Sequence, residues 1–172
     1  MTGAEGLPTG WMRLPLSQAI APRGEKASPV DHPEASFIGM DHVEAQTGKI
    51  IGYVPAQSMK SAAARFKAGD VLYGRLRPYL NKVTRPKFDG LASAEFIVFP
   101  DNGFIANGFL EYRLRSRDFV SFASHLNEGD RPRVDFAQIG DFSFDVPPLP
   151  EQHRIVAKIE ELFSELDAGT AS

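Results

Sequence analysis

The residues best suited to chemistry in this sequence are cations, and they are concentrated in one stretch. Residues 65–88 contain seven basic side chains and one acidic side chain, a local balance of +6. Aromatic residues lie between the bases, among them Tyr73 and Tyr79. Guanidinium and ammonium groups bind phosphate oxygens, and arginine and asparagine also make paired hydrogen bonds to guanine and adenine. The composition of this stretch therefore favours contact with nucleic acid.

The candidate contact residues lie beside predicted turns. Part of the set comes from the basic stretch, and part comes from a loop that follows Gly129. The residues predicted to contact DNA are Arg75, Arg77, Tyr79, Asn81, Lys82, Arg85, Lys87, Arg131 and Arg133. The alternative that the charge pattern leaves open is a solvated basic face, with some of the arginines held in internal ion pairs.

The net charge of the chain hides this segregation. The 172 residues include 19 Lys and Arg against 22 Asp and Glu, a formal net charge of −3, which taken alone argues against a nucleic-acid partner. The acids collect elsewhere, because residues 151–167 hold five acids and two bases. The distribution of charge is therefore more informative than its sum.

The sequence lacks the constellations that enzymes use. It contains no GxxxxGK[ST] or GxGxxG loop, its four histidines form no metal-ligand pair, and it has no cysteine. Two motifs of DNA enzymes are incomplete. Pro147-Pro148 lacks the polar residue before it and the aromatic residue after it that an amino-methyltransferase needs, and Arg113 stands where a PD-(D/E)xK nuclease needs lysine. We predict a chain without catalysis, metal or cofactor.

Short strands and turns dominate the predicted secondary structure. Apolar or alternating runs predict strands at residues 37–40, 50–54, 71–73, 91–99, 109–114 and 142–146. Residues 116–126 predict a helix capped by Ser116, because apolar residues recur there at helical spacing. Residues 56–65 predict one or two helical turns. The predicted fold class is α+β, an irregular, curved, mostly-β domain with a few short helices.

The last part of the chain predicts a long helix from Pro150 to about Asp167. Proline suits the first helical turn, and Glu151 follows where the helix dipole favours a carboxylate. Apolar residues spaced by 4, 3 and 4 form a heptad seam. The predicted helix-packing residues are Ile155, Ile159, Leu162, Phe163 and Leu166. We predict a domain over residues 1–149 and the beginning of a coiled-coil helix over 150–172.

Four blocks resemble the target recognition domain of type I restriction–modification specificity subunits. GDVLYGRLRPYLNK at 69–82, followed by SAEFIV at 93–98, carries the likeness in the middle of the chain. Residues 7–14 are similar to the opening of the family, and residues 37–50 are similar to its first strand pair. PPLPEQHRIV at 147–156 is the most specific block and resembles the entry into the family's spacer helix. The resemblance covers nearly the whole chain.

This resemblance implies sequence-specific recognition of one half-site of a bipartite double-stranded DNA target. It implies that two recognition domains sit on two antiparallel helices, which set the distance between half-sites. Methylation subunits bind the helices, restriction subunits bind through them, and these partners carry S-adenosylmethionine and ATP for DNA methylation and restriction. The chain has room for one domain and part of one helix. We expect a fragment of a longer subunit, or a half-subunit that self-associates through the spacer helix.

A second class of function stays open from the residues alone. The alternative is a protein–protein adaptor that acts through the heptad helix, with the basic stretch incidental. A stand-alone methyltransferase or nuclease is disfavoured by the incomplete motifs. The sequence has no apolar run of about 18 residues, and its first ten residues lack the regions of a signal peptide. We expect a cytoplasmic protein without a membrane partner.

Overall fold

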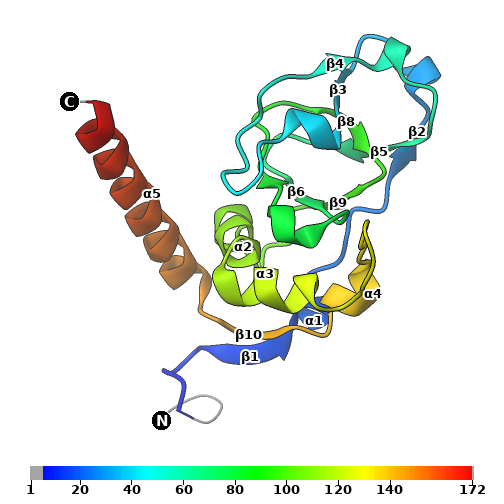
Figure 1. Cartoon of the computed structure of the whole chain (residues 1–172). Coiled ribbons are helices and arrows are strands. Elements are labelled where there is room, and N and C mark those ends of the chain that lie inside the picture. Colours follow the sequence, from blue (N-terminus) through cyan, green and yellow to red (C-terminus); the bar gives the residue numbers. More distant parts are fainter. Residues whose placement is uncertain (1–5, 172) are drawn as a thin grey trace.

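Three small β-sheets and several short helices form the body of the protein, and one long helix projects from it (Figure 1). The computed structural model describes residues 6–171. Residues 1–5, on which the expectation of no signal peptide partly rests, lie outside the described part. The architecture confirms the predicted α+β class, in which short strands alternate with turns and short helices.

The strands are two to four residues long, as the many turn residues in the sequence predict. In chain order they are β1 (Met12–Pro15), β2 (Lys26–Ala27), β3 (Ser36–Ile38), β4 (Val54–Pro55), β5 (Ala63–Phe66), β6 (Val71–Gly74), β7 (Val83–Thr84), β8 (Gly90–Ser93), β9 (Phe96–Phe99) and β10 (Ser143–Val146).

Short helices follow the strands, and only the last helix is long. The α-helices of the described residues are α1 (Leu16–Ala19), α2 (Asn107–Leu114), α3 (Arg117–Ser124), α4 (Phe136–Ile139) and α5 (Leu149–Ala171). Single 3-10 turns are η1 (Pro29–Asp31), η2 (Met40–His42), η3 (Ala56–Ser58) and η4 (Pro78–Leu80).

The strand order connects distant parts of the sequence. The largest sheet has the order β2-β5-β8-β3-β4, and its β3–β8 pair is parallel. The second sheet has the order β7-β6-β9. The short turn between Ser93 and Phe96 leads from β8 in the largest sheet to β9 in the second. β1 pairs antiparallel with β10, with Met12 opposite Val146. This last pair brings the N-terminal strand to the base of α5 (Figure 1).

Phenylalanine fills the main core, which lies between the helices, the β1–β10 pair and the β6–β9 strands. Phe119 is fully buried, and its ring contacts those of Tyr73 and Phe142 edge-on at 5.7 and 5.1 Å between centroids. The Arg113 guanidinium lies 5.3 Å from the centre of the Phe142 ring. These aromatic contacts account for much of the phenylalanine that the composition shows, because large rings bury the most apolar surface per residue.

The structure confirms some predicted elements and corrects others. The helix predicted over 116–126 is α3, but the Ser116 hydroxyl bonds to Asp118 and to the Arg113 carbonyl and does not cap the helix; the Phe119 amide donates to the Asp118 carboxylate instead. The strand predicted over 109–114 is wrong, because these residues form α2. The helical turns predicted over 56–65 are present only as η3, and β5 follows them. Tertiary packing overrides local propensity in these short segments.

The long C-terminal helix is confirmed, and it begins at Leu149, one residue before the predicted start. Its first turns pack against the body, since Ile155 and Val156 contact the main core. Further along, Leu162 is 46% exposed and Leu166 is 65% exposed. Among the described residues, no helix is both long enough and apolar enough to cross a membrane. The division of the chain at residue 149 into two domains stays a prediction.

Candidate nucleic-acid interface

The predicted basic stretch does not form one continuous surface. β6 and β7 pair antiparallel, with Leu72 opposite Thr84, so that residues 75–77 and residues 85–87 leave opposite ends of this hairpin. Four residues of strand span about 13 Å at about 3.3 Å per residue. The structure therefore divides the predicted contact residues into two groups, one beside η4 and the other beside α5.

The group beside α5 is engaged within the protein. The Arg85 Nε donates to Glu111 at 2.9 Å, and its Nη2 lies 3.5 Å from the Glu160 carboxylate on α5. A cleft of about 580 Å³ lies between the body and the helix, and Arg85 and the exposed Lys87 both line it. Arg85 thus joins the helix to the body, which the sequence pattern did not indicate.

The group beside η4 contains two arginines without an acidic partner. Arg75 and Arg77 are half-buried, and among the described residues neither side chain forms an ion pair or hydrogen bond. In both, the Nε atom is buried and has no partner. A buried donor of this kind is costly unless a ligand or water meets it, so the pair marks a candidate contact point.

The backbone around η4 is strained. Arg77 has φ 51° and Asn81 has φ 52°, which is the left-handed region that non-glycine residues seldom adopt. Several bonds hold the turn in this form: the Gln46 amide donates to the Leu80 carbonyl at 2.9 Å, and the Asn81 side chain donates to the Arg115 carbonyl at 3.3 Å. Strain that surrounding structure enforces is common where side chains are presented to a ligand.

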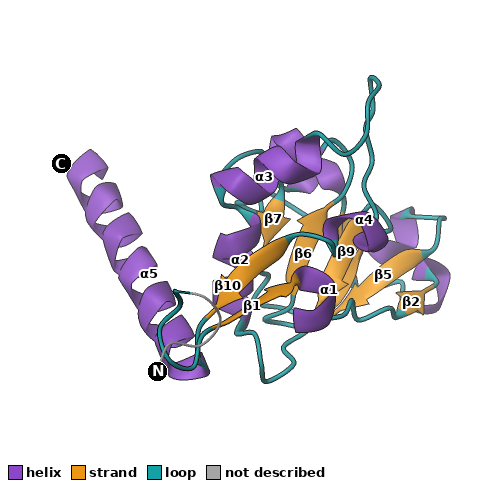
Figure 2. Ribbon diagram, turned by 90° about the horizontal axis from the view of Figure 1, so that it is seen from below, coloured by secondary structure: helices purple, strands orange, loops and turns teal. Residues whose placement is uncertain are grey.

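The loop of residues 129–133 packs against η4. The Arg77 amide donates to the Pro132 carbonyl at 2.7 Å, and the Val134 amide donates to the Arg75 carbonyl at 3.0 Å. Figure 2 shows the connection between α3 and α4, which contains this loop, extending away from the body. The structure thus brings together two predicted contact segments that lie about 50 residues apart in the sequence.

Within this loop, the two predicted arginines have different surroundings. Arg133 makes two hydrogen bonds to the Glu95 carboxylate, at 2.7 and 3.0 Å. Arg131 is exposed and, within residues 6–171, has no ion pair or hydrogen bond from its side chain. The Glu95 amide also donates to the Ser93 hydroxyl at 3.1 Å, within the turn between β8 and β9.

The remaining predicted contact residues lie close to η4. Tyr79 is 46% exposed on the turn. The Lys82 ammonium donates to the Met40 carbonyl at 2.7 Å and so connects the hairpin to the largest sheet. Asn81 keeps its side-chain oxygen buried without a partner. Of Tyr79, Asn81 and Lys82, only Tyr79 is exposed, and the other two are half-buried.

A groove opens beside these loops. It has a volume of about 610 Å³, and Leu76, His42, Met59 and Glu95 are among the residues that line it. The His42 Nδ1 accepts a hydrogen bond from the Gly39 amide at 2.9 Å, which leaves Nε2 as the proton-bearing nitrogen of the neutral ring. The lining of the groove thus combines apolar side chains with side chains that can form hydrogen bonds.

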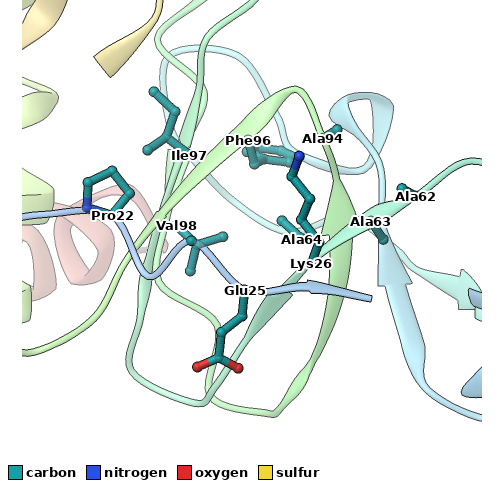
Figure 3. A pocket seen from close by; sticks show the side chains of 11 residues that line it. Pro22, Glu25, Lys26, Ala62, Ala63, Ala64, Ala94, Phe96, Ile97 and Val98 are labelled. Carbon is teal, nitrogen blue, oxygen red and sulfur yellow. The ribbon is translucent and has the colours of Figure 1, made fainter. Parts of the chain in front are cut away.

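A second, smaller pocket is lined by residues of β2, β5 and β9. It has a volume of about 230 Å³. Figure 3 shows its alanine, proline and valine side chains, with the Lys26 side chain extending toward Phe96 and the Glu25 carboxylate pointing the opposite way. Glu25 pairs with Arg23 at 3.3 Å and with Arg65 at 3.7 Å. No group of three His, Asp or Glu side chains in the described part of the chain could hold a metal ion.

The predicted helix-packing residues lie along α5 at increasing distance from the body. Ile155 contacts the main core, and Ile159 lines a pocket of about 380 Å³ with Leu162 and Phe163. The Phe163 ring contacts that of Tyr112 on α2, with 5.9 Å between centroids. Leu162 is nearly half exposed and Leu166 is mostly exposed, so the helix has an apolar face that the body covers only in part.

Comparison with known proteins places this fold. No protein-family model matches the chain. The chain is 32% identical over 164 residues to the type I restriction enzyme EcoDI specificity subunit of Escherichia coli, and the match covers 94% of this chain and 36% of that protein.

Two solved structures agree with this match. The crystal structure of the HsdS subunit from Thermoanaerobacter tengcongensis superposes with a TM-score of 0.82 at 28% identity, over 99% of this chain and 46% of that one. A chain from a structural study of complex assembly in the type I R-M system gives a TM-score of 0.79 at 29% identity, over 95% and 45%.

The fold, with several small sheets, short helices and a long C-terminal helix, matches that of the target recognition domain of these subunits. The chain belongs to the specificity subunits of type I restriction–modification systems, as its sequence blocks predicted. It spans less than half the length of the relatives that it matches. Specificity subunits are the non-catalytic component of these systems and carry no cofactor.

Proposed function

We propose that the chain recognises one half-site of a bipartite double-stranded DNA target. The single observation that supports this most is the juxtaposition of residues 75–81 with residues 129–133. Together these two segments present three arginines that no acid within residues 6–171 neutralises, Arg75, Arg77 and Arg131, beside a groove. A guanidinium without an internal partner can bind a phosphate or a guanine edge without first breaking an ion pair.

In this proposal the chain directs DNA methylation and restriction but performs neither. Methylation subunits, and restriction subunits through them, are the proposed protein partners, and S-adenosylmethionine and ATP are bound by them. The apolar face of α5 supports contact with a second helix or with a methylation subunit. Leu162 and Leu166 are exposed on this face and belong to the heptad seam. The cytoplasm, where the DNA is found, is the proposed location.

Selection from a random pool of DNA duplexes tests the proposal. The chain should enrich a short motif, and duplexes with this motif should then bind with an affinity that falls steeply as salt rises. Replacing both Arg75 and Arg77 with alanine should weaken binding at least tenfold. A matched control removes two charges from surface ion pairs elsewhere, Arg13 on β1 and Arg154 on α5, and should change binding less than threefold.

The same experiment separates DNA recognition from the adaptor alternative. An adaptor that acts through α5 would enrich no motif, and the two double variants would bind DNA equally weakly. Reversing the charge of Arg85 is a poor substitute for this test, because the change would also break the contacts of Arg85 with Glu111 and with Glu160 on α5. Arg75 and Arg77 are better positions, since they have no such contact within the described chain.

A further inference from the structure

The first turn of α5 is attached to the body by the side chain of Gln152, which is completely buried. Its Oε1 accepts a hydrogen bond from the Ala106 amide at 2.7 Å, just before α2. Its Nε2 donates to the carbonyls of Phe104 and Pro147, both at 2.9 Å. Both amide hydrogens and the oxygen are therefore used, and the three partners lie on two separate segments of the chain.

A second contact lies one turn further along α5. Gly108 on α2 has so little space that a Cβ atom there would lie 2.9 Å from one methyl group of Val156 and 3.3 Å from the other. The two helices are therefore in close contact at this point, and a side chain larger than hydrogen would push them apart. Arg85 adds a third contact by reaching Glu160 on the following turn.

These three contacts form what we call the joint: Gln152 with its partners, Gly108 against Val156, and Arg85 with Glu160. The segment that leads into α5 is stiff as well, since Pro147 and Pro148 precede Leu149 and each proline restricts its own backbone. Beyond the joint, α5 extends away from the body (Figures 1 and 2). The direction of the exposed part of the helix is thus determined by a few contacts at its base.

We propose that Gln152 is a positioning residue that, together with the Gly108–Val156 contact, fixes the angle at which α5 leaves the recognition domain. A small change of angle at the base moves the far end of a long helix by several ångströms. The consequence, that the joint sets the separation and rotation of two DNA half-sites, rests on the proposed function. The rigidity of the joint itself does not, and it can be measured without DNA.

The absence of cysteine allows a direct measurement of this angle. Cysteines are introduced at two exposed positions, Ser121 on α3 and Ala168 near the end of α5, and carry spin labels. Electron–electron double resonance then gives the distribution of distances between body and helix, with excess unlabelled chain present to remove contributions between molecules. The chain with native Gln152 should give one narrow distribution.

Three variants test the joint in this labelled background. Gln152→Met keeps the volume but loses the hydrogen bonds, and should broaden the distribution at least twofold. Gly108→Ala should shift the mean distance, and adding Val156→Ala should bring the mean back, because the methyl groups that the new Cβ meets are removed. His153→Met, at the exposed neighbour of Gln152, is the control and should leave the distribution unchanged.

Thermal melting followed by circular dichroism accompanies each measurement. A purely structural role for Gln152 would lower the melting temperature and leave the distribution of the folded chain narrow, and this result would overturn the proposal. If the Gln152→Met chain does not fold, the Gly108 pair decides. An unchanged mean in Gly108→Ala, or no return in the double variant, would then overturn the proposal. Loss of DNA binding by Arg75 variants would have no bearing on it.

Discussion

The Arg23 guanidinium donates two hydrogen bonds to the Asp70 carboxylate, at 2.7 and 2.9 Å, and Asp70 is only 3% exposed. The same carboxylate accepts a third bond from the Lys67 amide at 2.9 Å. The hydrogen bonds from Arg23 to Asp70 raise the pKa of Arg23 above its usual value. Asp70, the single acid of the basic stretch, thus pairs with an arginine about 50 residues earlier in the sequence rather than with a base of its own stretch.

Replacing Asp70 with asparagine should destabilise the fold strongly. Arg23 would keep its charge in a mostly buried site with only the half-exposed Glu25 carboxylate left as a partner, and removing one partner of a buried pair costs about 3 kcal/mol or more. Urea unfolding at pH 7 measures this free energy. Asp145→Asn, which breaks the exposed pair with Arg13, is the matched control and should cost less than about 1 kcal/mol. Equal losses in the two variants would contradict this interpretation.

The parts of this fold that were predictable from sequence depend on local patterns. The helix over residues 149–171 follows from its apolar spacing, and the strands β6 and β10 follow from short apolar runs. The strand predicted over 109–114 is wrong because Phe109, Leu110 and Leu114 do not show a clear helical stripe. The close packing of Gly108 against α5 is a long-range contact, which local patterns do not reveal.

The candidate site shows the same limit. The residue types at positions 75–87 and 131–133 indicate nucleic-acid contact, but their grouping depends on strand pairing and on which acids lie nearby. Glu111 neutralises Arg85 but lies outside the basic stretch. Glu95 neutralises Arg133 but is distant in sequence from the loop of residues 129–133. Gln152 gave only a weak signal, because a glutamine in a first helical turn is common on protein surfaces.

Removing Arg131 should lower the salt dependence of DNA binding. Its side chain is exposed on a loop, and we propose that it contacts a phosphate rather than a base. Loss of one phosphate contact should reduce the slope of log K against log salt by about 0.9, with similar losses of affinity on different duplexes. Fluorescence anisotropy between 50 and 200 mM salt measures the slope. Arg13→Ala is the control and should leave the slope unchanged. If Arg131→Ala leaves the slope unchanged as well, Arg131 does not contact a phosphate.

The start of α3 should make stability depend on acid pH. Arg113 donates two hydrogen bonds to Asp118, at 2.6 and 2.7 Å, and this holds the pKa of the carboxyl well below its usual range. A carboxyl whose pKa is lower in the folded chain stabilises the fold above the unfolded pKa, about 3.9, and loses that contribution as pH falls below it. Urea midpoints of the native chain and of Asp118→Asn should therefore differ by a constant amount between pH 5 and 7. The difference should shrink below pH 4. A difference in urea midpoint that stays constant down to pH 3 would contradict a stabilising role for the ionised Asp118 carboxyl.

The two ends of the α5 seam should respond differently to substitution. Ile155 packs against the main core, so Ile155→Ala should cost about 1 kcal/mol or more of the free energy of unfolding, less than a fully buried isoleucine would. Leu162 is nearly half exposed, and Leu162→Ala should cost less than about 0.5 kcal/mol in the isolated chain. If the exposed part of the seam binds a partner helix, Leu162→Glu should lower the sedimentation coefficient or the capture of a methylation subunit while the urea midpoint barely changes. Unfolding of the Leu162→Glu chain would instead show that this residue belongs to the core of the domain.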